Sequence, residues 1–123
     1  MQPNERDTGY VFDMLQFARE ALDLAANVAI NSPLDQIRSR RALERTISLI
    51  GEAANNVSRE FQSAHSEIPW SEIIGQRNWL VHGYRDIELR RIRDVVDNRL
   101  QPLIAQLVAL LPEPPSDPEP EES

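Results

Sequence analysis

Four side chains with chemically versatile groups fall within one eight-residue stretch of the chain: Arg77, Asn78, His82 and Tyr84. An arginine can grip a phosphate, an amide can hydrogen-bond a sugar or a base, and a histidine titrates near neutral pH. A phenol adds a nucleophilic oxygen. No other segment concentrates chemistry in this way, so the stretch is the candidate site.

The spacing within the stretch limits how a single helix could use it. Asn78 and His82 are four residues apart and share a helix face. Arg77 and His82 are five apart, which separates them by about 140° around a regular helix. Two arrangements would bring them together: the helix unwinds before His82, or a second copy of the segment completes the site across a two-fold axis.

The residue types favour cleavage of RNA without a metal. His82 is suited to proton transfer, Arg77 can neutralise a phosphate as charge develops on it, and Asn78 can orient His82 or a ribose hydroxyl. The chain has two histidines and no cysteine, and no carboxylate cluster surrounds the histidines, so we expect neither a metal site nor a cofactor. The structural alternative is a histidine at a helix end that is simply satisfied by its neighbours.

Length and composition predict one helical domain with an acidic tail. The 123 residues carry a net charge of −7, and the polar N-terminus lacks a signal peptide's apolar run. No apolar stretch approaches the roughly 20 residues that span a bilayer, so we expect a cytoplasmic protein without membrane contact. Residues 1–111 form the predicted domain. Residues 112–123 are rich in proline and acids, which predicts a disordered tail.

All of the basic residues in the chain are arginines, and there is no lysine. The overall acidity argues against strong nonspecific binding of nucleic acid, although it leaves room for a local basic cleft. An arginine cluster near the start of the second predicted helix is either a solvated face, with pairs such as Arg41 with Glu44, or part of an RNA-binding rim. The rim candidates are Arg38, Arg40, Arg41 and Arg45, together with Arg85.

Apolar residues at helical spacing predict an all-α bundle of four to five helices. The expected helices cover residues 10–31, 33–64, 69–83 and 86–111. Ser32 and Pro33 suit the start of the second helix, and Gly83 suits the end of the third. Pro102 should kink or split the fourth. Three small residues beside Glu52 would let a neighbouring backbone approach, and Glu52 could pair with a buried arginine.

The second and fourth helices each carry a long apolar seam. The seam of the second is Leu43, Ile47, Ile50, Ala54, Val57 and Phe61. The seam of the fourth is Leu89, Ile92, Val96, Leu100, Leu103, Leu107 and Leu110.

The stretch from Arg77 to Tyr84 resembles the R-x4-H-x-Y motif of the HEPN superfamily, in its HepT-like branch. The flanks resemble that branch too: residues 49–53 look like its second helix, and residues 68–78 look like its approach to the motif. The likeness covers about residues 10 to 110. The branch supplies the toxins of HepT–MntA toxin–antitoxin pairs.

The resemblance implies an up-and-down helical bundle that homodimerises, or forms a higher oligomer, with its motif helices facing each other. It implies a metal-independent endoribonuclease of tRNA or mRNA, with Arg77 and His82 as the catalytic pair and Asn78 at the polar position beside them. It also implies that an MntA-like nucleotidyltransferase antitoxin silences the toxin by transferring AMP to Tyr84. Two alternatives stay open: a non-catalytic helical partner of a nucleotidyltransferase, and a nucleotide-binding accessory protein.

Overall fold

The computed structural model describes the backbone of residues 5–28, 33–82 and 85–112, and the side chains of these residues except 27, 28, 33–37, 77–82 and 85–89. The described chain is all-α, as the sequence predicts, and contains no strand. In chain order the elements are α1 (Glu5–Val28), α2 (Pro33–Asn56), α3 (Arg59–Ala64), α4 (Trp70–His82), α5 (Arg85–Asp94), the π-helical turn η1 (Val95–Arg99) and α6 (Leu100–Leu110).

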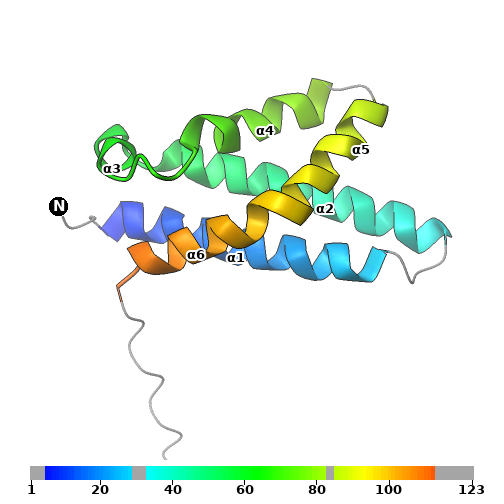
Figure 1. The fold of residues 1–123 in the computed structure, drawn as a ribbon, viewed down its shortest axis with the longest axis horizontal. Coiled ribbons are helices and arrows are strands. Elements are labelled where there is room, and N and C mark those ends of the chain that lie inside the picture. Colours follow the sequence, from blue (N-terminus) through cyan, green and yellow to red (C-terminus); the bar gives the residue numbers. More distant parts are fainter. Residues whose placement is uncertain (1–4, 29–32, 83–84, 113–123) are drawn as a thin grey trace, which may run out of the picture.

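The helices form a bundle with α2 at its centre (Figure 1). The chain reverses between α1 and α2, so these two long helices pack antiparallel, and α4 packs against α2. The segments α5, η1 and α6 follow one another without a break, and α6 returns to pack on α1. The predicted bundle of four to five helices is therefore confirmed.

The predicted apolar faces form the core. On α1, Met14 and Ala18 are fully buried, and on α2, Ile47 and Ala54 are fully buried as well. Every member of the predicted seam of the second helix is buried. The two alanines that follow Glu52 are buried too, as expected for small residues that admit a neighbouring backbone closely.

The predicted helix over residues 33–64 is wrong in one respect, because it divides at Val57 and Ser58. Ser58 is extended (φ −61°, ψ 151°) and caps α3, since its hydroxyl accepts a hydrogen bond from the Phe61 N–H at 3.1 Å. The buried carboxylate of Asp7 accepts from the Ser58 N–H at 2.8 Å and from its hydroxyl at 2.7 Å. Gln62 donates to the Val57 carbonyl, which the end of α2 leaves without a helical partner.

The predicted irregularity before Pro102 takes the form of the π turn η1. Proline lacks an N–H and its ring crowds the carbonyl four residues earlier, at Asn98, which lies inside η1. The Leu100 N–H donates to the Val95 carbonyl, a five-residue step. That step places Val95 in the core and leaves Val96 half-buried, which corrects the predicted seam by one position.

Several predictions fall outside the described residues, namely the Ser32 cap, Gly83 at the end of the third helix, and the tail over residues 113–123. The observed bounds of α2 and α4 nevertheless agree with a start at Pro33 and an end before Gly83. In the part of the chain that the structure describes, no helix is both long enough and apolar enough to cross a membrane.

We expect the Asp7 carboxylate to be a main determinant of stability. Replacing it with alanine removes two charge-assisted hydrogen bonds and leaves the Ser58 N–H without this acceptor. The free energy of unfolding should fall by about 2–4 kcal/mol. Urea unfolding followed by circular dichroism measures the change.

The matched control is Asp13→Ala, which removes an exposed acid from the same helix. It should change the free energy of unfolding by less than about 0.5 kcal/mol. Equal stability of the two variants would show that the Asp7 contact does not hold the α2–α3 corner.

Candidate functional site

The candidate stretch lies where α4 turns into α5, at one end of the bundle (Figure 1). Arg77, Asn78 and His82 belong to the backbone of α4, and Arg85 is the first residue of α5. Tyr84 lies in the link outside the described residues. The structure does not describe the side chains of these five residues. It therefore fixes only the backbone positions of Arg77, Asn78, His82 and Arg85 along their helices.

The backbone of α4 bears on one of the two arrangements that the spacing left open, unwinding of the helix before His82. Helix α4 runs without interruption through His82, so it does not unwind ahead of that residue. Arg77 and His82 therefore stand about 140° apart around one α-helix. The unbroken helix argues against the first arrangement, and completion of the site by a second copy stays a prediction.

Two contacts position α4. Its first residue, Trp70, is buried, and the indole N–H donates to the His65 carbonyl at 3.0 Å. The Trp70 ring also meets Phe61 edge-on, with ring centroids 6.2 Å apart. One turn later Ile73 enters the core beside α2.

The first half of α2 lies at the same end of the bundle as the candidate stretch. The two helices run antiparallel (Figure 1), and Ile50 of α2 and Ile73 of α4 line one groove. Arg41 lies nine residues before Ile50, and His82 lies nine residues after Ile73. Because both helices rise about 1.5 Å per residue, His82 is about level with Arg41 along the two helices. The backbone therefore brings the predicted arginine rim and the motif to one end of the fold.

The rim arginines are placed as follows. Arg38, Arg41 and Arg45 are exposed and Arg40 is half-buried. Glu44 pairs with Arg40 at 3.8 Å, where the sequence suggested Arg41. Among the described side chains, Glu52 lies 4.0 Å from Arg45, whose side chain is 70% exposed rather than buried.

A groove of about 420 Å³ separates the first half of α4 from η1 and α6. Its lining combines apolar side chains with charged and polar ones, and the apolar part includes Ile50, Ile73, Val95 and Leu103. Gln76, immediately before Arg77, is 7% exposed and lines the groove, and its side-chain oxygen has no hydrogen-bond partner among the described residues.

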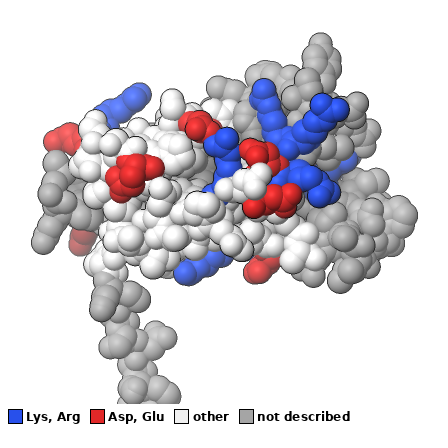
Figure 2. All heavy atoms as spheres, viewed as in Figure 1, with Lys and Arg blue, Asp and Glu red and all other residues white. Residues whose placement is uncertain are grey.

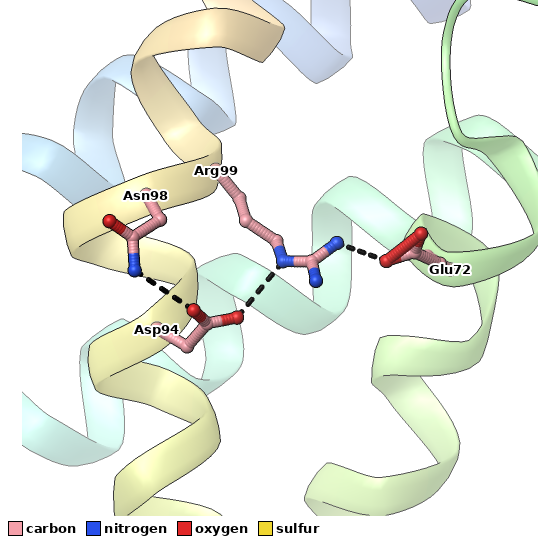
Figure 3. Close-up of polar contacts among 4 residues, drawn as sticks. All are labelled: Glu72, Asp94, Asn98 and Arg99. Carbon is pink, nitrogen blue, oxygen red and sulfur yellow. Dashed lines mark hydrogen bonds and ion pairs between the residues drawn. The ribbon is translucent and has the colours of Figure 1, made fainter.

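An ion-pair network spans this groove (Figure 3). Arg99 of η1 donates to the Asp94 carboxylate at 2.9 Å and also to the Glu72 carboxylate of α4. Asn98 donates to Asp94 at 2.9 Å. The π turn makes the Asp94–Arg99 contact possible, because its backbone hydrogen bonds join residues five apart and bring such residues to nearly the same face of the helix. The network therefore ties the motif helix to the arm that follows it.

The network shifts the pKa values of Asp94 and Arg99. Hydrogen bonds from Asn98 and then Arg99 hold the pKa of the Asp94 carboxyl below its usual range, and the Asp94 and Glu72 carboxylates raise the pKa of Arg99. Because the pKa of the Asp94 carboxyl is lowered in the folded protein, the carboxylate stabilises the fold at pH values above the ordinary carboxyl pKa. This stabilisation is lost as the pH falls through the lowered pKa. Asp94 and Arg99 are about half exposed, so solvent screening keeps the effect small.

Sequence reasoning missed the groove and its network. Asp94 and Arg99 do not share a face on a regular helix, so only the π turn reveals them as partners. Among the described residues no group of three or more histidine, aspartate or glutamate side chains is placed to hold a metal ion.

Comparison with known proteins relates the whole fold to one family. The family model described as "Ribonuclease HepT-like" matches residues 14–110, which include the candidate stretch. A "Probable ribonuclease HepT" of Thermococcus cleftensis is 30% identical over 82 residues, covering 63% of this chain and 74% of its own length. No solved structure matches.

Two further relatives are named "Putative RNase". The one from Caldanaerobacter subterraneus subsp. tengcongensis is 37% identical over 71 residues, which are 58% of this chain and 63% of that protein. The one from Methanocaldococcus jannaschii is 28% identical over 86 residues, which are 69% of this chain and 79% of that protein. Because the family model spans most of the chain, including α4 and the start of α5, the chain belongs to the HepT-like ribonuclease family.

Proposed function

We propose that this protein is an endoribonuclease that cuts RNA without a metal ion, with Arg77 and His82 as its catalytic residues. The observation that carries the proposal is the HepT-like match over residues 14–110, which includes the R-x4-H-x-Y stretch. The relatives' names as ribonucleases support the same reaction class.

The chemistry follows from the residue types. His82 accepts the proton of a ribose 2′-hydroxyl, and the 2′-oxygen attacks the adjacent phosphorus. A 2′-oxygen–phosphorus bond forms and the bond from phosphorus to the 5′-oxygen breaks, with a proton passing to the departing 5′-oxygen. Arg77 stabilises the charge on the phosphoryl oxygens, and Asn78 orients His82 or the ribose. The products are a 2′,3′-cyclic phosphate and a 5′-hydroxyl.

The active unit in this proposal is a homodimer, with higher oligomers built from such dimers. Because α4 is unbroken through His82, one helix presents Arg77 and His82 in different directions. Two α4 helices that meet across a two-fold axis would let Arg77 of one copy and His82 of the other share one phosphate.

Regulation is the second part of the proposal. The protein acts as the toxin of a toxin–antitoxin pair, and an MntA-like nucleotidyltransferase transfers AMP from ATP to the Tyr84 hydroxyl oxygen, with release of pyrophosphate. Tyr84 is two residues from His82 in the chain, so a bulky anionic adenylate there would occupy the place of an incoming RNA phosphate. Arg38, Arg40, Arg41, Arg45 and Arg85 are proposed to contact the RNA, since the backbone brings α2 and the α4–α5 corner to one end of the bundle.

RNA cleavage by purified variants in EDTA tests the reaction. His82→Ala should lower the cleavage rate by about 10²–10⁴-fold, because proton transfer in the transition state is lost. Mapping the ends of the products should reveal the cyclic phosphate. The matched control is His65→Ala, which removes the other histidine, a half-buried ring 4.4 Å from that of Phe61.

His65→Ala should keep the wild-type rate. Cleavage at the same rate by wild type and by His82→Ala would reject His82 as the catalyst. An absence of cleavage by the wild-type protein on every RNA class tried would reject the ribonuclease proposal and leave the non-catalytic partner as the better reading.

Intact-mass measurement after co-expression with the cognate nucleotidyltransferase tests the proposed switch. The wild-type chain should gain one or more adenylate-sized increments, and Tyr84→Phe should gain none, because the acceptor oxygen is missing. Tyr10→Phe serves as the control, since Tyr10 is the other of the chain's two tyrosines and lies on α1 beneath the Arg6 guanidinium. Increments that persist in Tyr84→Phe would place the modification elsewhere.

A further inference from the structure

The outer face of α5 carries three arginines within four residues. Arg90, Arg91 and Arg93 are exposed, whereas Ile92 between them is buried at 5% exposure. At about 100° per residue, the three arginines span an arc of about 160° whose centre lies opposite Ile92. We call these three residues the α5 arginine face.

The acid that follows this face is already engaged. Asp94 would be placed to pair with Arg90 or Arg91, which lie four and three residues before it on the helix. Its two carboxylate oxygens instead accept hydrogen bonds from Asn98 and Arg99 (Figure 3). Among the described side chains, neither Arg90 nor Arg93 has an ion pair.

The position of α5 makes its outer face accessible. The helix leaves the motif corner and crosses in front of the bundle, to which it is joined through η1 (Figure 1). Figure 2 shows basic side chains gathered around α5, with acidic side chains between and below them. Arg90 lies eight residues after His82 in the chain, and Arg93 follows about one helical turn later.

The groove behind α5 has the opposite character. Its lining includes three acids, Glu67, Glu72 and Asp94, against a single arginine, Arg99. Such a lining repels phosphates, whereas exposed guanidinium groups bind them through paired hydrogen bonds. An RNA strand that leaves the motif corner therefore meets attractive charge on the outer face of α5 and repulsive charge in the groove.

We propose that the α5 arginine face is a track for the phosphates of single-stranded RNA that flank the cleaved bond. This inference rests on the proposed function and deepens it, because it assigns RNA contacts outside the motif and outside the α2 cluster. Arg99 acts here as a positioning residue: by engaging Asp94 it keeps that carboxylate from neutralising the face.

RNA binding by the full-length chain as a function of salt tests the proposal. All proteins carry His82→Ala so that the RNA stays uncut, and binding of a fluorescein-labelled single-stranded RNA is followed by anisotropy. The test variant is R90Q/R93Q, and the matched control is R19Q/R59Q, which removes two exposed arginines from α1 and α3. Thermal unfolding checks that each variant is folded.

Loss of two phosphate contacts should make the slope of log affinity against log salt concentration shallower by about 1.4, at about 0.7 per contact for single strands. We expect R90Q/R93Q to bind at least about tenfold more weakly in low salt, and R19Q/R59Q to match the parent. R90K/R93K keeps the charges and should recover most of the slope, with affinity below that of the parent because lysine lacks the paired donors.

Equal slopes for R90Q/R93Q and R19Q/R59Q would overturn the proposal. The proposal would also be overturned if R90Q/R93Q lost binding of the nucleotidyltransferase but kept binding of RNA, because the α5 arginine face would then belong to a protein partner. Cleavage is measured separately with His82 intact. If the protein cuts RNA but R90Q/R93Q and R19Q/R59Q show equal slopes, the nuclease function stands and the phosphate track is rejected. If the protein cuts no RNA but R90Q/R93Q selectively loses RNA binding, the track stands and the nuclease function is rejected.

Discussion

Burial of α2 against two neighbours is the constraint on which the rest of this structure depends. Ile47 and Ala54 are completely buried, and Ile50 is nearly so, because α1 and α4 pack against the same central helix. A buried isoleucine contributes about 1.5–3 kcal/mol, and small residues at Ala53 and Ala54 allow close approach of the neighbouring backbone. Packing against α2 fixes the course of α4, and with it the position of the candidate catalytic residues.

The course of α4 bears directly on how the proposed site could be assembled. An arginine and a histidine five residues apart on an unbroken helix cannot easily reach one phosphate from one copy of the chain. The HepT-like family relation supplies the reaction class, and the continuity of α4 supplies the reason to place the reaction between two copies. The Arg99 network contributes by tying α4 to the arm that bears the α5 arginine face.

Much of this arrangement could be predicted from the sequence because it depends on local periodicity. The all-α bundle, the buried seam of α2 and the start and end of α4 all follow from helical spacing and from proline and glycine signals. The division of α2 from α3 could not be predicted as readily, because it depends on Asp7, which is 51 residues from Ser58. The π turn was foreseen only as a disturbance near Pro102, because helical periodicity does not show where the chain takes a five-residue step.

Mixing of two inactive proteins tests the central claim of a shared site most directly. Arg77→Ala and His82→Ala proteins are each assayed alone on RNA and then after exchange of subunits. If Arg77 and His82 act across the two-fold axis, each mixed dimer regains one intact site, and random exchange restores about a quarter of the wild-type activity. Activity of the mixture that never rises above that of the separate variants would contradict a site shared between two copies.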